Sequence, residues 1–83
     1  MRIIMYGATH CEDTQRTRAQ LQALGRVFED INIDHDLMAE QFVIYVNHGG
    51  RSTPTVIFEA TTRRKIVLVE PTDAEVEAAL EAE

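Results

Sequence analysis

The chain has 83 residues, of which 45% are hydrophobic and 27% charged, a composition that favours one folded domain over residues 1–83. Its 14 acidic and 8 basic side chains give a net charge of −6, which argues against nucleic-acid binding because no basic stripe could neutralise phosphates. A single cysteine excludes an intrachain disulfide. Without a signal-peptide pattern or a long apolar run, we expect a cytoplasmic protein that does not enter a membrane.

The first half of the chain predicts a strand, a helix and a second strand. Residues 2–6 are apolar and partly β-branched, which is typical of a strand. Residues 12–24 predict a helix, which Gly25 ends in a left-handed cap. Residues 27–33 alternate with period two, as a strand does. This order favours a right-handed βαβ unit with parallel strands.

The second half predicts a helix, a hairpin and a last helix. A second helix would start in residues 34–36, and its apolar face would consist of Leu37, Met38, Phe42, Val43 and Val46. Residues 55–58 and 66–69 predict two antiparallel strands, because the polar turn that joins them is short. A capping box predicts a third helix from Thr72. The expected fold is α/β, with a four-stranded mixed sheet in the order βαβ, α, ββ, α and three flanking helices.

The lone cysteine, Cys11, stands where the first strand turns into the first helix. Unpaired N–H groups and the helix dipole at that position stabilise a thiolate, which is the reactive form of cysteine. Glu12 and Asp13 would repel the thiolate, and His10, mostly uncharged at neutral pH, would offset this only slightly. We therefore predict a thiol pKa modestly below that of free cysteine. The alternative is a buried cysteine that serves as a small hydrophobic residue.

Three segments resemble the small glutaredoxins and the related mycoredoxin- and NrdH-type redoxins. Residues 5–11 resemble the loop before the family's active thiol, residues 50–56 its loop with a cis-proline, and residues 69–73 its turn before the last helix. The resemblance covers nearly the whole chain and implies a thioredoxin-like fold. It also implies that Pro54 is a cis-proline facing Cys11 and that the Thr53 backbone is exposed to pair with a peptide-like ligand.

The active-site segment departs from the family motif C-P-x-C. Glu12 replaces the proline, and Thr14 replaces the second cysteine, either as filler or as a hydrogen-bond partner of the Cys11 sulfur. Without a second thiol, a mixed disulfide at Cys11 can be resolved only by an external thiol such as glutathione or mycothiol. The expected function is therefore a monothiol thiol–disulfide oxidoreductase that acts on protein mixed disulfides.

The resemblance also implies a binding site for the small thiol. Its residues would be Arg51, Ser52, Thr53, Pro54, Thr72 and Asp73, with Arg51 as a carboxylate ligand and the start of the third helix as an anion site. Two other functions stay open. One is a redox-silent binding module, and the less favoured one is an iron–sulfur carrier, because the segment does not match the C-G-F-S motif of cluster-binding relatives.

Two further expectations concern metals and partners. His10, His35 and His48 do not form a compact ligand set with Cys11, so no metal site is expected. On the second helix, Ile44 and Tyr45 would point outward if Phe42, Val43 and Val46 face the sheet. They would then be either partly covered by a neighbouring loop or a contact for a partner protein or a weak dimer.

Overall fold

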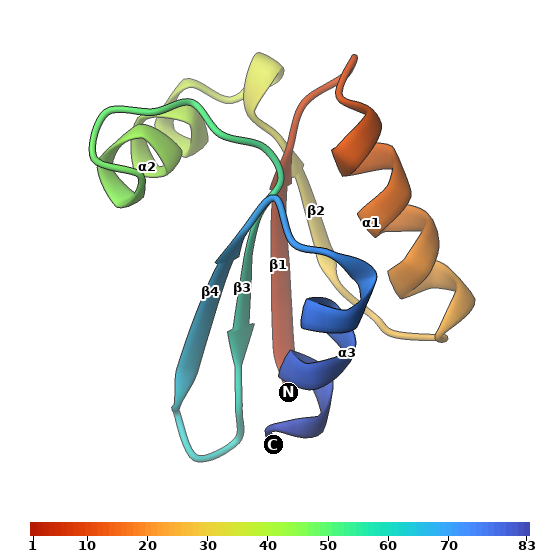
Figure 1. Cartoon of the computed structure of the whole chain (residues 1–83). Helices are drawn as coiled ribbons and strands as arrows, with labels where there is room; N and C mark the ends of the chain where they lie inside the picture. The colour runs from red at the N-terminus through yellow and green to blue at the C-terminus, as the bar shows by residue number, and fades with distance from the viewer.

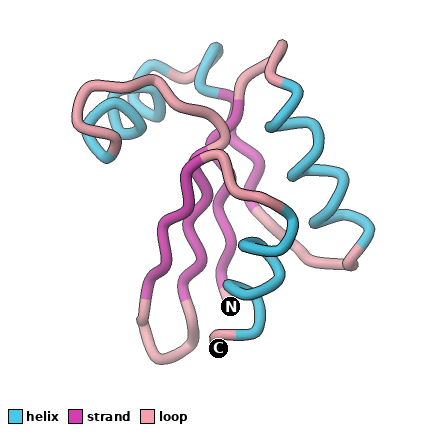
Figure 2. The backbone as a smooth tube through the Cα atoms, in the orientation of Figure 1, coloured by secondary structure: helices cyan, strands magenta, loops and turns pink.

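The computed structural model describes residues 1–83 and contains one mixed sheet with helices around it (Figure 1). The strands are β1 (Arg2–Gly7), β2 (Glu29–Asn32), β3 (Thr55–Glu59) and β4 (Lys65–Val69). The α-helices are α1 (Glu12–Ala23), α2 (Leu37–Val46) and α3 (Asp73–Glu81), and a short 3-10 helix, η1 (Ile33–His35), precedes α2. This is the predicted order of elements, and Figure 2 shows the loops that join them.

The sheet has the strand order β2-β1-β3-β4. Strands β1 and β2 are parallel, while β3 runs antiparallel to both β1 and β4. The parallel pair follows from the α1 crossover, and the antiparallel pair β3–β4 follows from its short hairpin connection. The predicted four-stranded mixed sheet with three helices is confirmed.

The main core lies between the sheet and the two helices α1 and α3. It is formed by seven buried residues from β1, β3, α1 and α3: Ile3, Met5, Leu21, Val56, Phe58, Val76 and Ala79. The residues that alternate with these on β1 and β3 point to the opposite face of the sheet. The face that carries α1 and α3 is thus better covered than the opposite face, on which Val67 and Val69 are exposed.

The inner face of α1 is unusually polar. Thr14 and Thr17 are fully buried together with Leu21, whereas Ala23 and Leu24 are exposed. The helix ends as predicted, with Gly25 in the left-handed region at a φ of 68°. The close approach of α1 to β1 therefore depends on compact threonines rather than on a stripe of large apolar residues.

Two predicted element boundaries are wrong. The strand predicted over residues 27–33 is only Glu29–Asn32, and Val27, before it, is 91% exposed. Ile33 belongs to η1, because the Asn32 side chain accepts a hydrogen bond from the Asp34 N–H and turns the chain there. The second helix begins at Leu37 with Asp36 as its N-cap, later than the predicted start in residues 34–36.

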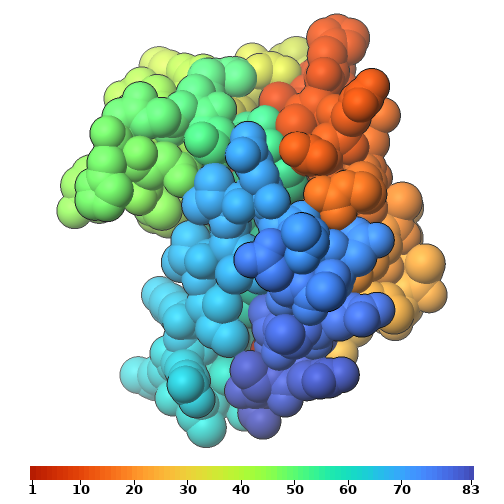
Figure 3. All heavy atoms as spheres, viewed as in Figure 1, coloured from red at the N-terminus to blue at the C-terminus, as the bar shows by residue number.

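The predicted apolar face of α2 is correct at Val43 but wrong at Leu37 and Met38. The helix buries Ala39 and Val43, which pack with Ile33 in a second, smaller cluster, while Leu37 is 70% and Met38 81% exposed. Apolar residues occur almost all round this helix, so their spacing does not select one face. Figures 1 and 3 show that α2 lies at the side of the molecule, near one end of the sheet.

The remaining predicted features of α2 concern its outer residues. Tyr45 is 83% exposed, as predicted, but Ile44 is half-buried. Phe42 is 36% exposed, and the centre of its ring is 5.1 Å from that of Tyr6 in β1. None of the helices is of the length and apolar character needed to span a membrane.

Candidate active site

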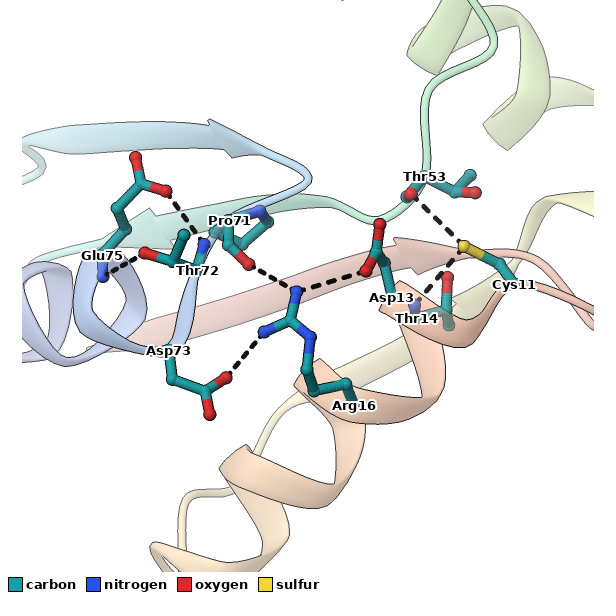
Figure 4. A network of polar contacts seen from close by, with 9 residues as sticks. All are labelled: Cys11, Asp13, Thr14, Arg16, Thr53, Pro71, Thr72, Asp73 and Glu75. Atoms are coloured by element: carbon teal, nitrogen blue, oxygen red, sulfur yellow. Dashed lines mark hydrogen bonds and ion pairs between the residues drawn. The ribbon is translucent and has the colours of Figure 1, made fainter.

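Cys11 is the N-cap residue of α1, with an extended backbone at φ −103° and ψ 115°. Its Sγ accepts a hydrogen bond from the Thr14 N–H at 3.4 Å, as an N-cap side chain does. The thiol in turn donates to the carbonyl oxygen of Thr53, also at 3.4 Å (Figure 4). The sulfur is therefore held between the first turn of α1 and the loop before β3.

The surroundings of Cys11 lower its pKa overall. Partial burial raises the pKa of the thiol, but the side-chain hydroxyls of Thr14 and Thr53 and the backbone N–H groups of Thr14 and Asp13 lower it by more in total. The carboxylate of Asp13 is exposed and paired with Arg16 at 3.4 Å, which weakens the repulsion that the sequence led us to expect. The direction of the shift is the predicted one.

Thr14 is fully buried and contacts the end of β1. Its hydroxyl accepts a hydrogen bond from the Ala8 N–H at 3.3 Å, and its methyl group lies where a side chain on Gly7 would have to stand. A Cβ on Gly7 would be 2.3 Å from the methyl carbon of Thr14. Thr14 therefore both fills the space between β1 and α1 and contributes to the hydrogen bonds around Cys11.

The loop before β3 presents Thr53 to the thiol. The peptide bond between Thr53 and Pro54 is cis, and both residues are buried. The Thr55 hydroxyl donates to the Ser52 carbonyl at 2.9 Å, and the Glu70 N–H donates to the Pro54 carbonyl at 2.8 Å. These bonds fix the loop between β3 and the end of β4.

Arg16 joins the thiol segment to the start of α3, a role that the sequence did not suggest. Its guanidinium lies 2.7 Å from the Asp73 carboxylate, donates to the Pro71 carbonyl at 2.8 Å and reaches Asp13 at 3.4 Å (Figure 4). Gln20, one turn further along α1, donates to the Asp73 carbonyl at 2.9 Å. No pattern in the sequence marks Arg16, because Asp73 lies 57 residues away along the chain.

Thr72 and Asp73 begin α3 as predicted. The Thr72 hydroxyl accepts from the Glu75 N–H at 3.1 Å, and the Glu75 carboxylate accepts from the Thr72 N–H at 2.9 Å, which completes the capping box. Asp73 is bound to Arg16. Asp73 therefore faces α1, whereas Thr72 bonds only within its own helix.

Arg51 forms no hydrogen bond with Cys11 and belongs to a different set of charges. It pairs with Glu40 at 2.6 Å and with Asp34, which also accepts from the Thr9 N–H at 2.9 Å. The Thr9 N–H and then Arg51 lower the pKa of Asp34 to about 2. This cluster ties α2 and η1 to the loop that precedes Cys11.

The other predicted site residues take smaller parts. His10 and Glu12 are exposed, and neither side chain makes a hydrogen bond within the chain. Ser52 takes part through its carbonyl only. Within the chain, no three side chains of histidine, cysteine, aspartate or glutamate are grouped so that they could hold a metal ion.

Comparison with known proteins places this arrangement in one family. The glutaredoxin family model matches residues 3–61. The structure is similar to the crystal structure of a glutaredoxin from Archaeoglobus fulgidus, with a TM-score of 0.70 and 22% identity over 98% of this chain and 87% of that one. It is also similar to the X-ray structure of a structural-genomics target protein from X. campestris, with a TM-score of 0.64 and 20% identity over 98% and 97% of the two chains.

No curated protein sequence matches the chain. The two similar structures establish the fold, an α/β thioredoxin-like fold with a four-stranded mixed sheet and three helices. The family model covers well over half of the chain and includes both the Cys11 segment and the Thr53–Pro54 loop. The chain therefore belongs to the glutaredoxin family.

Proposed function

We propose that this protein is a monothiol thiol–disulfide oxidoreductase in which Cys11 is the nucleophile. The strongest support is the environment of the Cys11 sulfur, which accepts a hydrogen bond at a helix N-terminus and has a lowered pKa. It is the chain's only cysteine, so the proposed cycle uses no internal resolving thiol.

The proposed cycle has two exchange steps. The Cys11 thiolate attacks the small-thiol sulfur of a protein mixed disulfide, and the protein's sulfur leaves as a thiolate that takes up a proton from water. Cys11 is then disulfide-bonded to the small thiol. A second small thiol, as its thiolate, attacks that disulfide, so that a dimeric small-molecule disulfide forms and the Cys11 thiolate returns.

We assign the docking of the small thiol to the two segments that flank Cys11. The Thr53 carbonyl lies within hydrogen-bond distance of the sulfur, where the backbone of a peptide-like thiol could pair with it. The N-terminus of α3 at Thr72 and Asp73 would receive an anionic group of the ligand. Arg51 would contribute only by exchanging Glu40 or Asp34 for a ligand carboxylate.

The proposal is tested by steady-state reduction of a peptide whose cysteine is disulfide-bonded to either glutathione or mycothiol. The corresponding free thiol is supplied as the second substrate. We expect turnover with at least one of them, and we expect Cys11→Ser to abolish it. Thr61→Ser, a change at an exposed residue remote from the sulfur in sequence, serves as the matched control and should leave the rate unchanged.

The outcome that contradicts the proposal is equally specific. If neither thiol supports turnover and iodoacetamide alkylates Cys11 no faster than a free cysteine at neutral pH, the protein is a redox-silent binding module. Visible absorbance after anaerobic reconstitution with iron and sulfide would instead assign an iron–sulfur cluster to Cys11 and external ligands.

A further inference from the structure

Strand β4 is an open edge of the sheet. It pairs with β3 on one side only, and no strand follows it in the order β2-β1-β3-β4 (Figure 1). Its sequence, KIVLV, is apolar except at its first residue, and Ile66, Val67 and Val69 are β-branched. Proteins usually protect such an edge with a bulge, a proline or inward-pointing charges, because unpaired N–H and C=O groups invite another strand.

The hydrogen bonds at the two ends of the hairpin show which groups of β4 are free. The Ala60 N–H donates to the Arg64 carbonyl, and the Glu70 N–H donates to the Pro54 carbonyl, each at 2.8 Å. In an antiparallel pair, alternate residues face the partner strand, so the even-numbered residues of β4 bond to β3. The N–H and C=O groups of Lys65, Val67 and Val69 therefore point to the open edge.

The side chains of these same three residues lie on the less covered face of the sheet. Ile66 and Leu68 pack against the main core, so Lys65, Val67 and Val69 point the other way. Val67 is 44% and Val69 42% exposed. A strand added beside β4 would thus gain backbone hydrogen bonds to these three residues and apolar contacts with the side chains of Val67 and Val69.

Charge at the two ends of β4 identifies the partner. Arg64, immediately before the strand, and Glu70, immediately after it, are both exposed, and neither forms an ion pair within the chain. The strand is basic at its start and acidic at its end. A second β4 that runs antiparallel would place the basic start of one copy beside the acidic end of the other.

We propose that two copies of this chain associate through their β4 edges and form a continuous eight-stranded sheet. The two-fold axis passes between the two Val67 residues, so that Val67 of one chain pairs with Val67 of the other. Lys65 of each chain then pairs with Val69 of the other chain. In this register the free N–H and C=O groups of all three residues find partners. The next pair outward joins Arg64 to Glu70, which offsets the repulsion between two chains of net charge −6.

Hydrogen exchange tests the register directly. As protein concentration rises to about 1 mM, the amide protons of Lys65, Val67 and Val69 should exchange at least roughly tenfold more slowly. The amides of Ile66 and Leu68 already bond to β3 and should not change. Equal exchange of Val67 at low and high concentration would overturn the proposal. A reducing agent is present throughout, so that no disulfide forms between two Cys11 residues.

Substitutions separate this interface from any other. Val67→Pro removes an N–H that β4 does not use within the monomer, and the fold should therefore remain intact while sedimentation velocity shows a monomer. Val67→Thr keeps the N–H and should still dimerise. If Val67→Pro dimerises as well as the natural chain, the association uses another surface, such as the exposed residues of α2 around Tyr45, and the proposal is wrong.

Charge reversal supplies an independent check. Arg64→Glu and Glu70→Arg should each weaken dimerisation roughly threefold to tenfold, because each creates two like-charge contacts in the symmetric dimer. The double variant exchanges the charges and should restore the dimerisation constant of the natural chain. Additive weakening in the double variant would contradict the antiparallel register.

Discussion

At the scale of single residues, Cys11 makes two contacts that favour opposite protonation states. The Thr14 N–H donates to the sulfur and stabilises the thiolate, whereas the Thr53 carbonyl can only accept a proton and so stabilises the thiol. Loss of the proton therefore frees the Thr53 carbonyl. In the proposed cycle, the reactive form of Cys11 leaves that carbonyl available to a ligand N–H.

The Thr14 hydroxyl provides the first prediction. The hydroxyl of Thr14 lowers the pKa of Cys11. Replacement of Thr14 by valine keeps the side-chain volume and the backbone N–H but removes this hydroxyl. We expect Thr14→Val to raise the thiol pKa and to slow alkylation of Cys11 at neutral pH, while Thr14→Ser retains the fast rate. The measurement is the alkylation rate as a function of pH. Identical profiles for the two variants would show that the hydroxyl does not act on the sulfur.

Asp34 provides a prediction for acid stability. Its pKa is lowered from 3.8 to about 2, so its carboxylate stabilises the folded chain above pH 3.8, and this stabilisation is lost as the pH falls towards 2. Asp34→Asn should lower the urea midpoint at pH 6 and should have no such effect near pH 2. Glu77→Gln, at an exposed residue without an ion pair, is the control. A constant difference at all pH values would contradict this assignment.

At the scale of elements, the contact between β1 and α1 depends on the missing side chain of Gly7. We expect Gly7→Ala to destabilise the chain by about 1–3 kcal/mol, because its methyl group would collide with the methyl of Thr14. Adding Thr14→Ser removes the atom in collision and should recover part of the loss. Chemical denaturation of the two single variants and the double variant measures this coupling. Strict additivity would show that the two residues do not meet.

The elements with their own end signals could be predicted from the sequence. Gly25 and the Thr72 capping box act over a few residues, and both ends are where the pattern indicated. The boundaries of β2 and α2 could not be predicted, because the Asn32 side chain turns the chain at η1. The buried face of α2 could not be predicted either, since almost every position in that helix could be buried.

The candidate site could be predicted only where a local pattern or the family resemblance marked a residue. Cys11 lies at the start of α1, as the strand–helix junction indicated, and the Thr53–Pro54 bond is cis, as the family resemblance implied. Arg16 was missed because nothing near it in the sequence distinguishes it from an ordinary surface arginine. Arg51 was predicted beside the ligand, but its contacts are with Asp34 and Glu40, acids that only the fold brings near it.

At the scale of the whole molecule, the chain has two unequal apolar clusters. The larger one joins α1 and α3 to the sheet, and the smaller one holds α2 through Ala39, Val43 and Ile33. Because so few buried residues hold α2, this helix should open without the rest of the fold. The loop tied to α2 by Arg51 would loosen with it.

One substitution in each apolar cluster tests whether α2 opens independently of the rest of the fold. Val43→Ala should lower the opening free energy of α2 amides by roughly 2 kcal/mol and leave the amides of β1 and β3 unchanged. Val76→Ala, in the larger cluster, should accelerate exchange in both regions, since it lowers the free energy of global unfolding. Native-state hydrogen exchange measures both variants. If Val43→Ala accelerates exchange in β1 as much as in α2, the chain unfolds as one unit.

The lone sulfur of Cys11 also determines how long a covalent complex lasts. In a dithiol relative, a neighbouring sulfur ends the complex within the same molecule, so its lifetime is a property of the fold. In the cycle proposed for this chain, the lifetime of the disulfide between Cys11 and the small thiol is instead inversely proportional to the concentration of thiols in the surrounding solution. In the proposed cycle the adduct between Cys11 and the small thiol therefore persists when free thiols are removed, and the mass of the trapped chain identifies the small thiol.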